Sequence, residues 1–250
     1  MLSVIYEPKG RAREYGELAA NLYKGCGHGC EYCYAPSATF TEKKIFHEAA
    51  RPRPGILDKF EKDCQALKNT GKRILLSFTT DPYQPIDQEY GLTRKAIEIL
   101  KSNGLNVEIL TKGGTRALRD FDLLKEEDYF ATTMTFLDPR KSMKWEPGAA
   151  LPDDRMEAMR YAHSLGIKTW VSLEPVIDPA ETLEIIRQTH EVVDLYKVGT
   201  LNYHPLSQSI DWDRFGREAT QLLRDYGKDY YIKKDLRQKI RTDSYWKNST

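Results

Sequence analysis

The chain reads CGHGCEYC at residues 26–33, which places Cys26, Cys30 and Cys33 in the spacing C-x3-C-x2-C. The remaining cysteine, Cys64, lies far along the chain. Three thiolates in one short loop, with no fourth nearby, predict a metal site that keeps one coordination position for another ligand. Open positions of this kind belong to catalytic metal centres, whereas fully ligated sites are usually structural.

Two kinds of metal centre fit this spacing. A four-iron, four-sulfur (4Fe-4S) cluster usually takes one thiolate per iron, so three cysteines leave one iron to be chelated by an amino and a carboxylate group. Gly27 and Gly29 permit the tight turns that aim three sulfurs at one cluster. Tyr32 and Tyr34 are placed to shield the cluster or to stack on a flat ligand ring. The alternative is a zinc site completed by His28 or a distant histidine, although no second ligand pair follows.

The wider stretch NLYKGCGHGCEYCYA, residues 21–35, resembles the radical S-adenosylmethionine (SAM) superfamily, in the branch related to spore photoproduct lyase. The resemblance covers about residues 15–205. It continues through four shorter motifs: TDPYQP at 80–85, TKG at 111–113, EPG at 146–148 and EP at 174–175. It implies a 4Fe-4S cluster on the three cysteines, SAM on the fourth iron, and a reducing electron donor such as flavodoxin or ferredoxin.

The composition is typical of a single soluble enzyme. The net charge of the 250 residues is +1 and the pI about 7.6, so no global field favours nucleic acid or an anionic membrane. The opening residues MLSVIY lack a signal pattern, and no apolar run reaches membrane-spanning length. Four cysteines in a chain of this length do not predict a disulfide framework. Free thiols and an oxygen-sensitive cluster predict a cytoplasmic protein without a membrane partner.

Hydrophobic periodicity predicts alternating strands and helices. We expect strands at 18–23, 74–79, 107–110, 129–136, 169–173 and 193–198, and helices at 52–69, 92–102, 115–126, 153–165 and 180–190. Such alternation predicts parallel strands with crossover helices, in a partial barrel or a doubly wound sheet. The resemblance favours an α/β fold with a partial (β/α)6 TIM-type barrel over residues 1–205, carrying the cluster loop at 26–33. A short C-terminal helical extension, residues 206–250, is expected to pack on the barrel.

Polar residues fall at the predicted carboxyl ends of the strands, where β/α barrels gather their functional side chains. SAM carries an ammonium group, a carboxylate, a ribose and an adenine. We expect Lys112 to neutralise the carboxylate, and Asp81 with the Thr80 hydroxyl to hold the ammonium group. The resemblance implies a hydroxyl group beside the ribose, for which Thr135 is favoured over Thr133. Simpler roles stay open, since Asp81 also suits a turn and Lys112 an exposed loop.

The substrate is expected at the open mouth of the barrel. The resemblance implies that SAM is cleaved reductively to a 5′-deoxyadenosyl radical, which takes hydrogen from the substrate. We expect Tyr34 to contact the adenine, and Tyr83, Glu174 and Tyr203 to line the substrate space, with Glu174 as an acid or base or else an ordinary loop residue. True spore photoproduct lyases carry a hydrogen-donating cysteine near the end of strand two. The segment SFTTD at 77–81 has no thiol, so authentic spore photoproduct repair is not expected.

The C-terminal tail and the substrate are the open questions. Residues 228–241 carry six basic and two acidic side chains with paired tyrosines, which suit either phosphate binding or a terminal helix or strand with a solvated basic face. We favour the second. The resemblance alone favours a nucleic acid or nucleotide substrate over a peptide or metabolite. Two other functions fit the cysteine loop: an iron-sulfur electron-transfer protein, or a zinc-dependent nucleic-acid binding module, against which the near-neutral charge counts.

Overall fold

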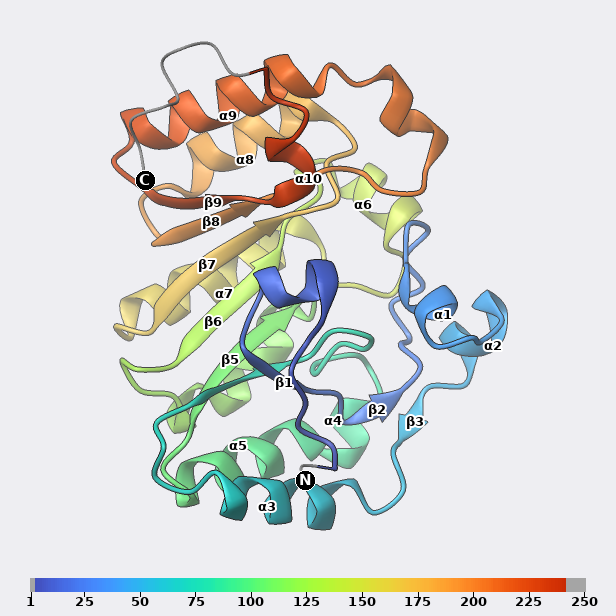
Figure 1. The fold of residues 1–250 in the computed structure, drawn as a ribbon, viewed down its shortest axis with the longest axis vertical. Coiled ribbons are helices and arrows are strands. Elements are labelled where there is room, and N and C mark those ends of the chain that lie inside the picture. The colour runs from blue at the N-terminus through green and yellow to red at the C-terminus, as the bar shows by residue number, and fades with distance from the viewer. Residues whose placement is uncertain (1–2, 242–250) are drawn as a thin grey trace.

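The computed structural model describes residues 3–241 and is built around one parallel sheet (Figure 1). The strands are β1 (Leu18–Ala20), β2 (Tyr23–Lys24), β3 (Arg51–Pro52), β4 (Arg73–Leu76), β5 (Asn106–Thr111), β6 (Tyr129–Thr133), β7 (Lys168–Leu173), β8 (Leu195–Val198) and β9 (Asp229–Ile232). Seven of them pair in parallel in the order β1-β4-β5-β6-β7-β8-β9, and β2 pairs with β3 in a separate antiparallel sheet. The edges of the main sheet are therefore β1 and β9, and the barrel is open between them.

The helices of the described residues are α1 (Ala35–Ala38), α2 (Lys43–Glu48), α3 (Ile56–Ala66), α4 (Asp87–Tyr90), α5 (Leu92–Ser102), α6 (Pro139–Trp145), α7 (Pro152–Ser164), α8 (Pro179–Thr189), α9 (Trp212–Asp225) and α10 (Lys234–Arg237), with the 3-10 helices η1 (Gly10–Glu14), η2 (Gly114–Leu123) and η3 (Pro205–Ser209). Among them α3, α5, α7, α8 and α9 cover the outer face of the sheet. Figure 1 shows α3 beside α5 under one end of the sheet and α8 beside α9 over the other. Their apolar faces bury Phe60, Leu100 and Leu223 in the main core. Phe60 is fully buried, so its replacement by alanine would cost about 3–5 kcal/mol.

The predicted fold class, a partial β/α barrel, is confirmed, and two details differ from the expectation. The C-terminal extension holds the helix α9, and after it a seventh parallel strand, β9, adds to the sheet by pairing with β8, with its apolar Ile232 buried in the main core. The helix expected at 115–126 is the 3-10 helix η2, which still turns Ala117 and Phe121 inward. The end of the expected extension, residues 242–250, lies outside the described residues.

Side chains inside the barrel separate its two ends. Ala19, Leu75, Ala131 and Trp170 form a buried apolar layer across the interior. The ammonium group of Lys197 lies 4.3 Å from the centre of the Trp170 ring, in a cation–π contact. This packed layer fills the middle of the barrel. A ligand site can therefore form only above the layer, at the carboxyl ends of the strands.

The N-terminal segment crosses the open side of the barrel, where it is the dark-blue ribbon in front of the sheet in Figure 1. Arg11 on η1 forms an ion pair with Asp235 on α10. Glu14 accepts hydrogen bonds from the Lys234 N–H, at 2.7 Å, and the Tyr231 hydroxyl, at 3.1 Å. The two ends of the described chain are thus joined across the gap between β1 and β9. Within residues 3–241, no helix combines the length and apolar character needed to cross a bilayer.

Candidate functional site

The cysteine loop lies between β2 and α1, above the carboxyl end of β1. Cys26 and Cys30 are buried, Cys33 is half-buried, and all three thiols are free. The loop is fixed from outside by α2, because the Cys26 N–H donates to the Phe46 carbonyl at 3.1 Å and His47 Nδ1 lies 2.9 Å from the Cys26 carbonyl. The three sulfur donors predicted from the sequence are therefore gathered in one buried loop.

The inner side of the loop docks on residues 145–148. The Glu31 N–H donates to the Trp145 carbonyl at 2.8 Å, and the Gly148 N–H donates to the His28 carbonyl at 2.9 Å. A Cβ atom on Gly148 would collide with the carbonyl oxygen of Gly27, so only glycine allows this close approach. The EPG motif at 146–148 thus has a structural role in seating the cysteine loop.

The chemistry of the donor set fits an iron-sulfur cluster. Burial raises the pKa of Cys26 well above its ordinary value and that of Cys30 to about 12. Buried thiols of this kind ionise only beside a cation, and a coordinated metal ion supplies that charge. Cys64, by contrast, is buried in the main core on α3. Among residues 3–241, no three His, Cys, Asp or Glu side chains are arranged as ligands of a single metal ion.

His28, the candidate fourth zinc ligand, is buried with protein partners at both ring nitrogens. Its Nδ1 lies 3.5 Å from Asp81 Oδ2, and its Nε2 lies 3.0 Å from an Arg116 nitrogen. Burial lowers the pKa of His28 to about 4, so the ring is neutral at physiological pH. His28 therefore links the cysteine loop to the carboxyl ends of the strands.

Asp81 and Thr80 lie just after β4. Asp81 accepts hydrogen bonds from the Thr111 hydroxyl at 2.6 Å, the Lys112 N–H at 2.7 Å and the Tyr83 N–H at 2.9 Å. Burial opposes ionisation of Asp81, but His28 and these donors hold its pKa below the ordinary value. The Thr80 hydroxyl lies 3.2 Å from the Ser77 hydroxyl. Asp81 is thus a charged carboxylate that ties the end of β4 to the end of β5.

A second carboxylate, Glu146, organises the wall next to the cysteine loop. Glu146 accepts hydrogen bonds from Tyr32, Arg155 and Thr135, the last at 3.1 Å. Burial would raise the pKa of Glu146, but Arg155 and Lys112 lower it below its ordinary value, so the carboxylate is charged. We call Tyr32, Lys112, Thr135, Glu146 and Arg155 the Glu146 group. Sequence reasoning quoted the EPG motif but assigned no role to Glu146 or Arg155.

Lys112 joins this group from the end of β5. Its ammonium group lies 5.7 Å from the centre of the Tyr32 ring. Burial alone would lower the pKa of Lys112, but Cys30 and Glu146 raise it above the ordinary value. Lys112 is therefore a fixed cation between the cysteine loop and the barrel floor, where an anionic ligand group would be stabilised.

A third carboxylate, Glu174, lies across the mouth at the end of β7. Its Oε2 accepts hydrogen bonds from the Tyr15 hydroxyl, at 2.7 Å, and from Lys233, and its Oε1 accepts from Asn202 at 3.3 Å. Burial and then Glu174 raise the pKa of Tyr15 well above its ordinary value, so this phenol stays protonated. We call Tyr15, Glu174, Asn202 and Lys233 the Glu174 group. Only Glu174 was predicted from the sequence, since the other three come from segments distant in the chain.

The predicted tyrosines lie in different environments. Tyr34 is 50% exposed beside the end of β4, where its hydroxyl donates to the Phe78 carbonyl at 2.9 Å. Tyr203 is 87% exposed at the rim, and its hydroxyl accepts a hydrogen bond from Arg11. Tyr83 is buried in the main core with its hydroxyl on Asp120, so the structure does not bring it to the mouth. A strand-end position was not enough to place Tyr83, because its side chain points outward into the helix layer.

Comparison with known proteins identifies the family. The model of the radical SAM superfamily matches residues 20–193, and the chain belongs to this superfamily. The matched span holds the three cysteines and all five members of the Glu146 group, but not Tyr15, Asn202 or Lys233 of the Glu174 group. The family implies a 4Fe-4S cluster and SAM as its cofactors.

Similar curated sequences include two uncharacterized proteins. The chain is 28% identical over 186 residues to the uncharacterized protein ORF301 of Acidianus two-tailed virus, covering 70% of this chain and 61% of the relative. It is 26% identical over 185 residues to the uncharacterized protein MJ0683 of Methanocaldococcus jannaschii, covering 73% and 69%. The match thus spans less than two thirds of the viral relative.

Solved structures share the fold. A variant of spore photoproduct lyase matches with a TM-score of 0.71 at 15% identity, covering 94% of this chain and 79% of the lyase. SuiB of Streptococcus suis, solved bound to SAM, matches with a TM-score of 0.62 at 12% identity, covering 85% of this chain and 49% of SuiB. These similarities establish the partial barrel and leave the reaction to be argued from the site.

Proposed function

We propose that the protein is an enzyme that cleaves SAM reductively at a 4Fe-4S cluster and directs the resulting reactivity at a substrate in the barrel mouth. The observation that carries the proposal is the position of the cysteine loop, which places two buried thiols and one half-buried thiol beside the Glu146 group. We further propose that an electron donor such as flavodoxin or ferredoxin reduces the cluster, and that the protein works in the reducing cytoplasm.

Cys26, Cys30 and Cys33 would hold the cluster. When bound together, the cluster and SAM supply a 5′-deoxyadenosyl radical that abstracts hydrogen. Lys112 would neutralise the SAM carboxylate, since its charge is held at the end of β5 by neighbouring acidic groups. Glu146 fixes the Thr135 hydroxyl, which suits a contact with the ribose.

Four further residues complete the proposed site for SAM and the cluster. Asp81 and Thr80 are proposed for the ammonium group, with Asp81 acting through its charge because its oxygens already accept several hydrogen bonds. Tyr34 is proposed for the adenine, because its half-exposed ring lies next to the cysteine loop. Tyr32 shields the loop, since its hydroxyl is held on Glu146.

The substrate would lie between the Glu174 group and the cysteine loop. Glu174 is the proposed acid or base, with Lys233 and Tyr15 holding its carboxylate, and Tyr203 at the rim would contact the substrate. A nucleotide or nucleic acid is the proposed substrate class, because solved spore photoproduct lyases that share the fold contain a dinucleoside photoproduct. Repair of that photoproduct is not proposed, because segment 77–81 has no thiol.

Metal analysis combined with a cleavage assay tests this proposal against its alternatives. The protein would be reconstituted anaerobically with iron and sulfide, analysed for iron, sulfide and zinc, and given SAM with dithionite. We expect about four irons per chain and formation of 5′-deoxyadenosine. A reducible cluster that never cleaves SAM would favour the electron-transfer protein. A colourless protein that holds zinc and refuses the cluster would favour the zinc-binding module.

A further inference from the structure

Residues 34–53 form an arm that wraps the outer side of the cysteine loop. The arm holds α1, α2 and β3, and Figure 1 shows it projecting from the side of the barrel. Phe46 on α2 is buried against Cys26 and Ala35, with Cys33 packed at the edge of this small core. Lys44 and Ile45, the two preceding residues of α2, are exposed. The helix α2 therefore covers Cys26 on this side, while Cys33 stays half-buried at the edge.

The outer face of the arm exposes apolar side chains that a monomeric surface would normally cover. Phe40, between α1 and α2, is 99% exposed, and Ile45 is 53% exposed. Phe40 also has a φ of 51°, a left-handed conformation that a bulky residue adopts at a cost of about 1 kcal/mol. An aromatic ring held outward at this cost points to a contact with another molecule.

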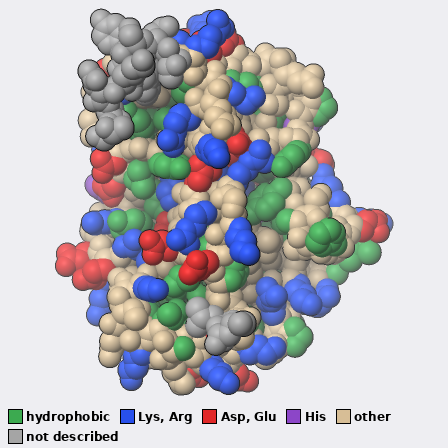
Figure 2. Space-filling view, viewed as in Figure 1, with side chains coloured by type: hydrophobic (Ala, Val, Ile, Leu, Met, Phe, Trp, Pro, Cys, Tyr) green, Lys and Arg blue, Asp and Glu red, His purple; other side chains and the backbone are tan. Residues whose placement is uncertain are grey.

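Cationic side chains surround this apolar tip. Lys24, Lys44 and Arg51 are exposed on β2, α2 and β3, and Figure 2 shows blue Lys and Arg side chains gathered below the arm. Lys43 forms an ion pair with Glu31 at 2.7 Å, and Glu42 and Glu48 are exposed acids just before and at the end of α2. An apolar centre whose rim carries a small excess of exposed cations suits an acidic protein partner.

We propose that this outer face of the arm docks an acidic protein that carries one electron to the cluster. The inference rests on the proposed function, because that function needs an electron delivered to the cysteine loop. The inner side of the loop is covered by residues 145–148 and faces the SAM and substrate groups, so the arm side is where a protein can approach. Phe46 packs in one small core with Cys26, with Cys33 at its edge, so the arm connects that face to the cysteine loop through packed side chains.

The experiment compares two reductants on charge variants of the arm. Reduced flavodoxin is the probe, dithionite is the small-molecule control, and cluster reduction is followed optically without SAM. Flavodoxin affinity is measured separately by fluorescence anisotropy. The double variant Lys44→Glu with Arg51→Glu should bind flavodoxin about tenfold more weakly, and be reduced by it correspondingly more slowly, at low salt. Its reduction by dithionite should not change.

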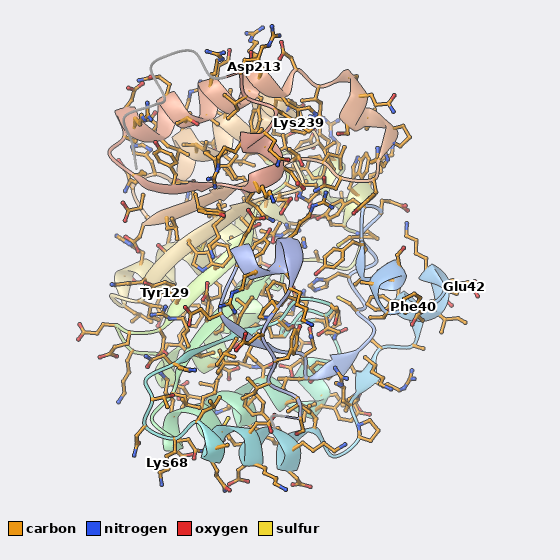
Figure 3. The ribbon with its side chains drawn as sticks, viewed as in Figure 1. Phe40, Glu42, Lys68, Tyr129, Asp213 and Lys239 are labelled. Carbon is orange, nitrogen blue, oxygen red and sulfur yellow. The ribbon has the colours of Figure 1, made fainter. Side chains whose placement is uncertain are left out.

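Two further variants sharpen the test. Glu42→Lys should tighten flavodoxin binding, by about two- to threefold for one added rim charge. Lys68→Glu is the matched control, because Lys68 is exposed beyond the end of α3, and Figure 3 labels it far from Phe40 and Glu42. This control should bind flavodoxin as the unaltered protein does. Phe40→Ser should weaken binding without changing its salt dependence.

Several results would overturn the docking proposal. One is a flavodoxin affinity that does not change in the double variant. Another is a loss of flavodoxin affinity in Lys68→Glu as large as that in the double variant. Equal slowing with dithionite would show that the arm only supports the cluster. Salt-dependent binding of a single-stranded oligonucleotide, lost in the same double variant, would assign the face to nucleic acid instead. Failure of the proposed function is separate, since 5′-deoxyadenosine is not measured in either assay.

Discussion

The Glu146 group and the Glu174 group face the same barrel mouth but are assembled in different ways. All members of the Glu146 group lie within the span matched by the family, although they come from separate segments, and the ion pair at its centre is fully buried. The Glu174 group draws Tyr15 from the N-terminal segment and Lys233 from just after β9, both outside that span. Its Lys233 is buried, but the Glu174 side chain is 15% exposed. The same kind of carboxylate is thus fixed once by the family's common core and once by the ends of this chain.

This difference suggests different roles for the two groups, which form opposite walls of the mouth. The Glu146 group lies within the span shared by the family, and therefore suits the step that all members share, the binding of SAM. The Glu174 group depends on the ends of this chain, and therefore suits the step that differs between members, the choice of substrate. The four predictions below test that division.

The largest effect is expected from removing the carboxylate at the centre of each group. Glu146→Ala leaves the Arg155 guanidinium buried without its counterion, and should lower the free energy of unfolding by about 3–5 kcal/mol. Glu174→Ala should cost less, about 1–2 kcal/mol, because the Glu174 side chain is itself 15% exposed and the buried Lys233 keeps Glu14, 3.9 Å away, as a second acid. Urea denaturation of both variants measures the difference. The double variant Glu146→Gln with Arg155→Met, which removes both charges, should recover part of the loss. Equal costs in the two groups would contradict the division.

The next effect concerns SAM affinity. Lys112→Met removes the proposed partner of the SAM carboxylate and should weaken SAM binding about 10- to 100-fold, which corresponds to one charged hydrogen bond. Lys233→Met is the matched control from the other wall, and should change SAM affinity less than about threefold. Isothermal titration of the reconstituted protein gives both values. A larger loss in the Lys233 variant would reverse the assignment of the two walls.

A smaller effect is expected on SAM cleavage without substrate. Glu174→Gln keeps the shape of the side chain and should leave the rate of 5′-deoxyadenosine formation within about threefold of the unaltered protein. Glu146→Gln, the same change in the other group, should lower that rate by about tenfold or more, because Thr135 and Tyr32 lose their charged acceptor. Chromatography of quenched reactions measures both rates. Similar losses in the two variants would show that Glu174 also serves SAM.

The smallest effect concerns the segment that carries Tyr15. Asp63 on α3 anchors this segment by accepting hydrogen bonds from the backbone N–H groups of Ser3, Val4 and Ile5, the shortest at 2.7 Å. Burial opposes its charge, but these donors hold the pKa of Asp63 below its ordinary value. Its stabilisation is therefore present above about pH 4 and is lost as the pH falls through the lower folded-state pKa.

Asp63→Asn tests that anchor. The variant should lose about 1 kcal/mol of stability at neutral pH, and its stability should converge with that of the unaltered protein in acid. Thermal melts over a pH series measure the two curves. A deficit that stays constant down to the lowest pH would show that the charge of Asp63 contributes nothing.

The sequence was sufficient for the parts of the site that are local in the chain. The cysteine spacing predicts one short loop that gathers three thiols, and the strand-end rule places Lys112, Thr135 and Glu174 at one mouth. The prediction that Tyr83 lines the mouth was wrong. A side chain that follows a strand can point either into the mouth or outward into the core under the helices, and Tyr83 takes the second direction. Which face a residue takes depends on its neighbours in space.

Other parts could not be predicted because they depend on pairing between distant segments. The sequence left residues 228–241 open between a terminal helix and a strand, and only the pairing of β9 with β8 makes this segment the seventh strand of the sheet. Tyr15 and Lys233 meet Glu174 because η1 crosses the open side of the barrel, and nothing in the spacing of either segment indicates this crossing.

The most direct test of the central claim is anaerobic quantification of 5′-deoxyadenosine from the reconstituted protein, SAM and dithionite. Cys30→Ala is run beside it, with Cys64→Ala as the matched control because Cys64 lies in the core on α3. The account predicts product from the unaltered protein and from Cys64→Ala, and none above background from Cys30→Ala. Equal product from Cys30→Ala, or none from a fully loaded unaltered protein, would contradict radical SAM chemistry at this loop.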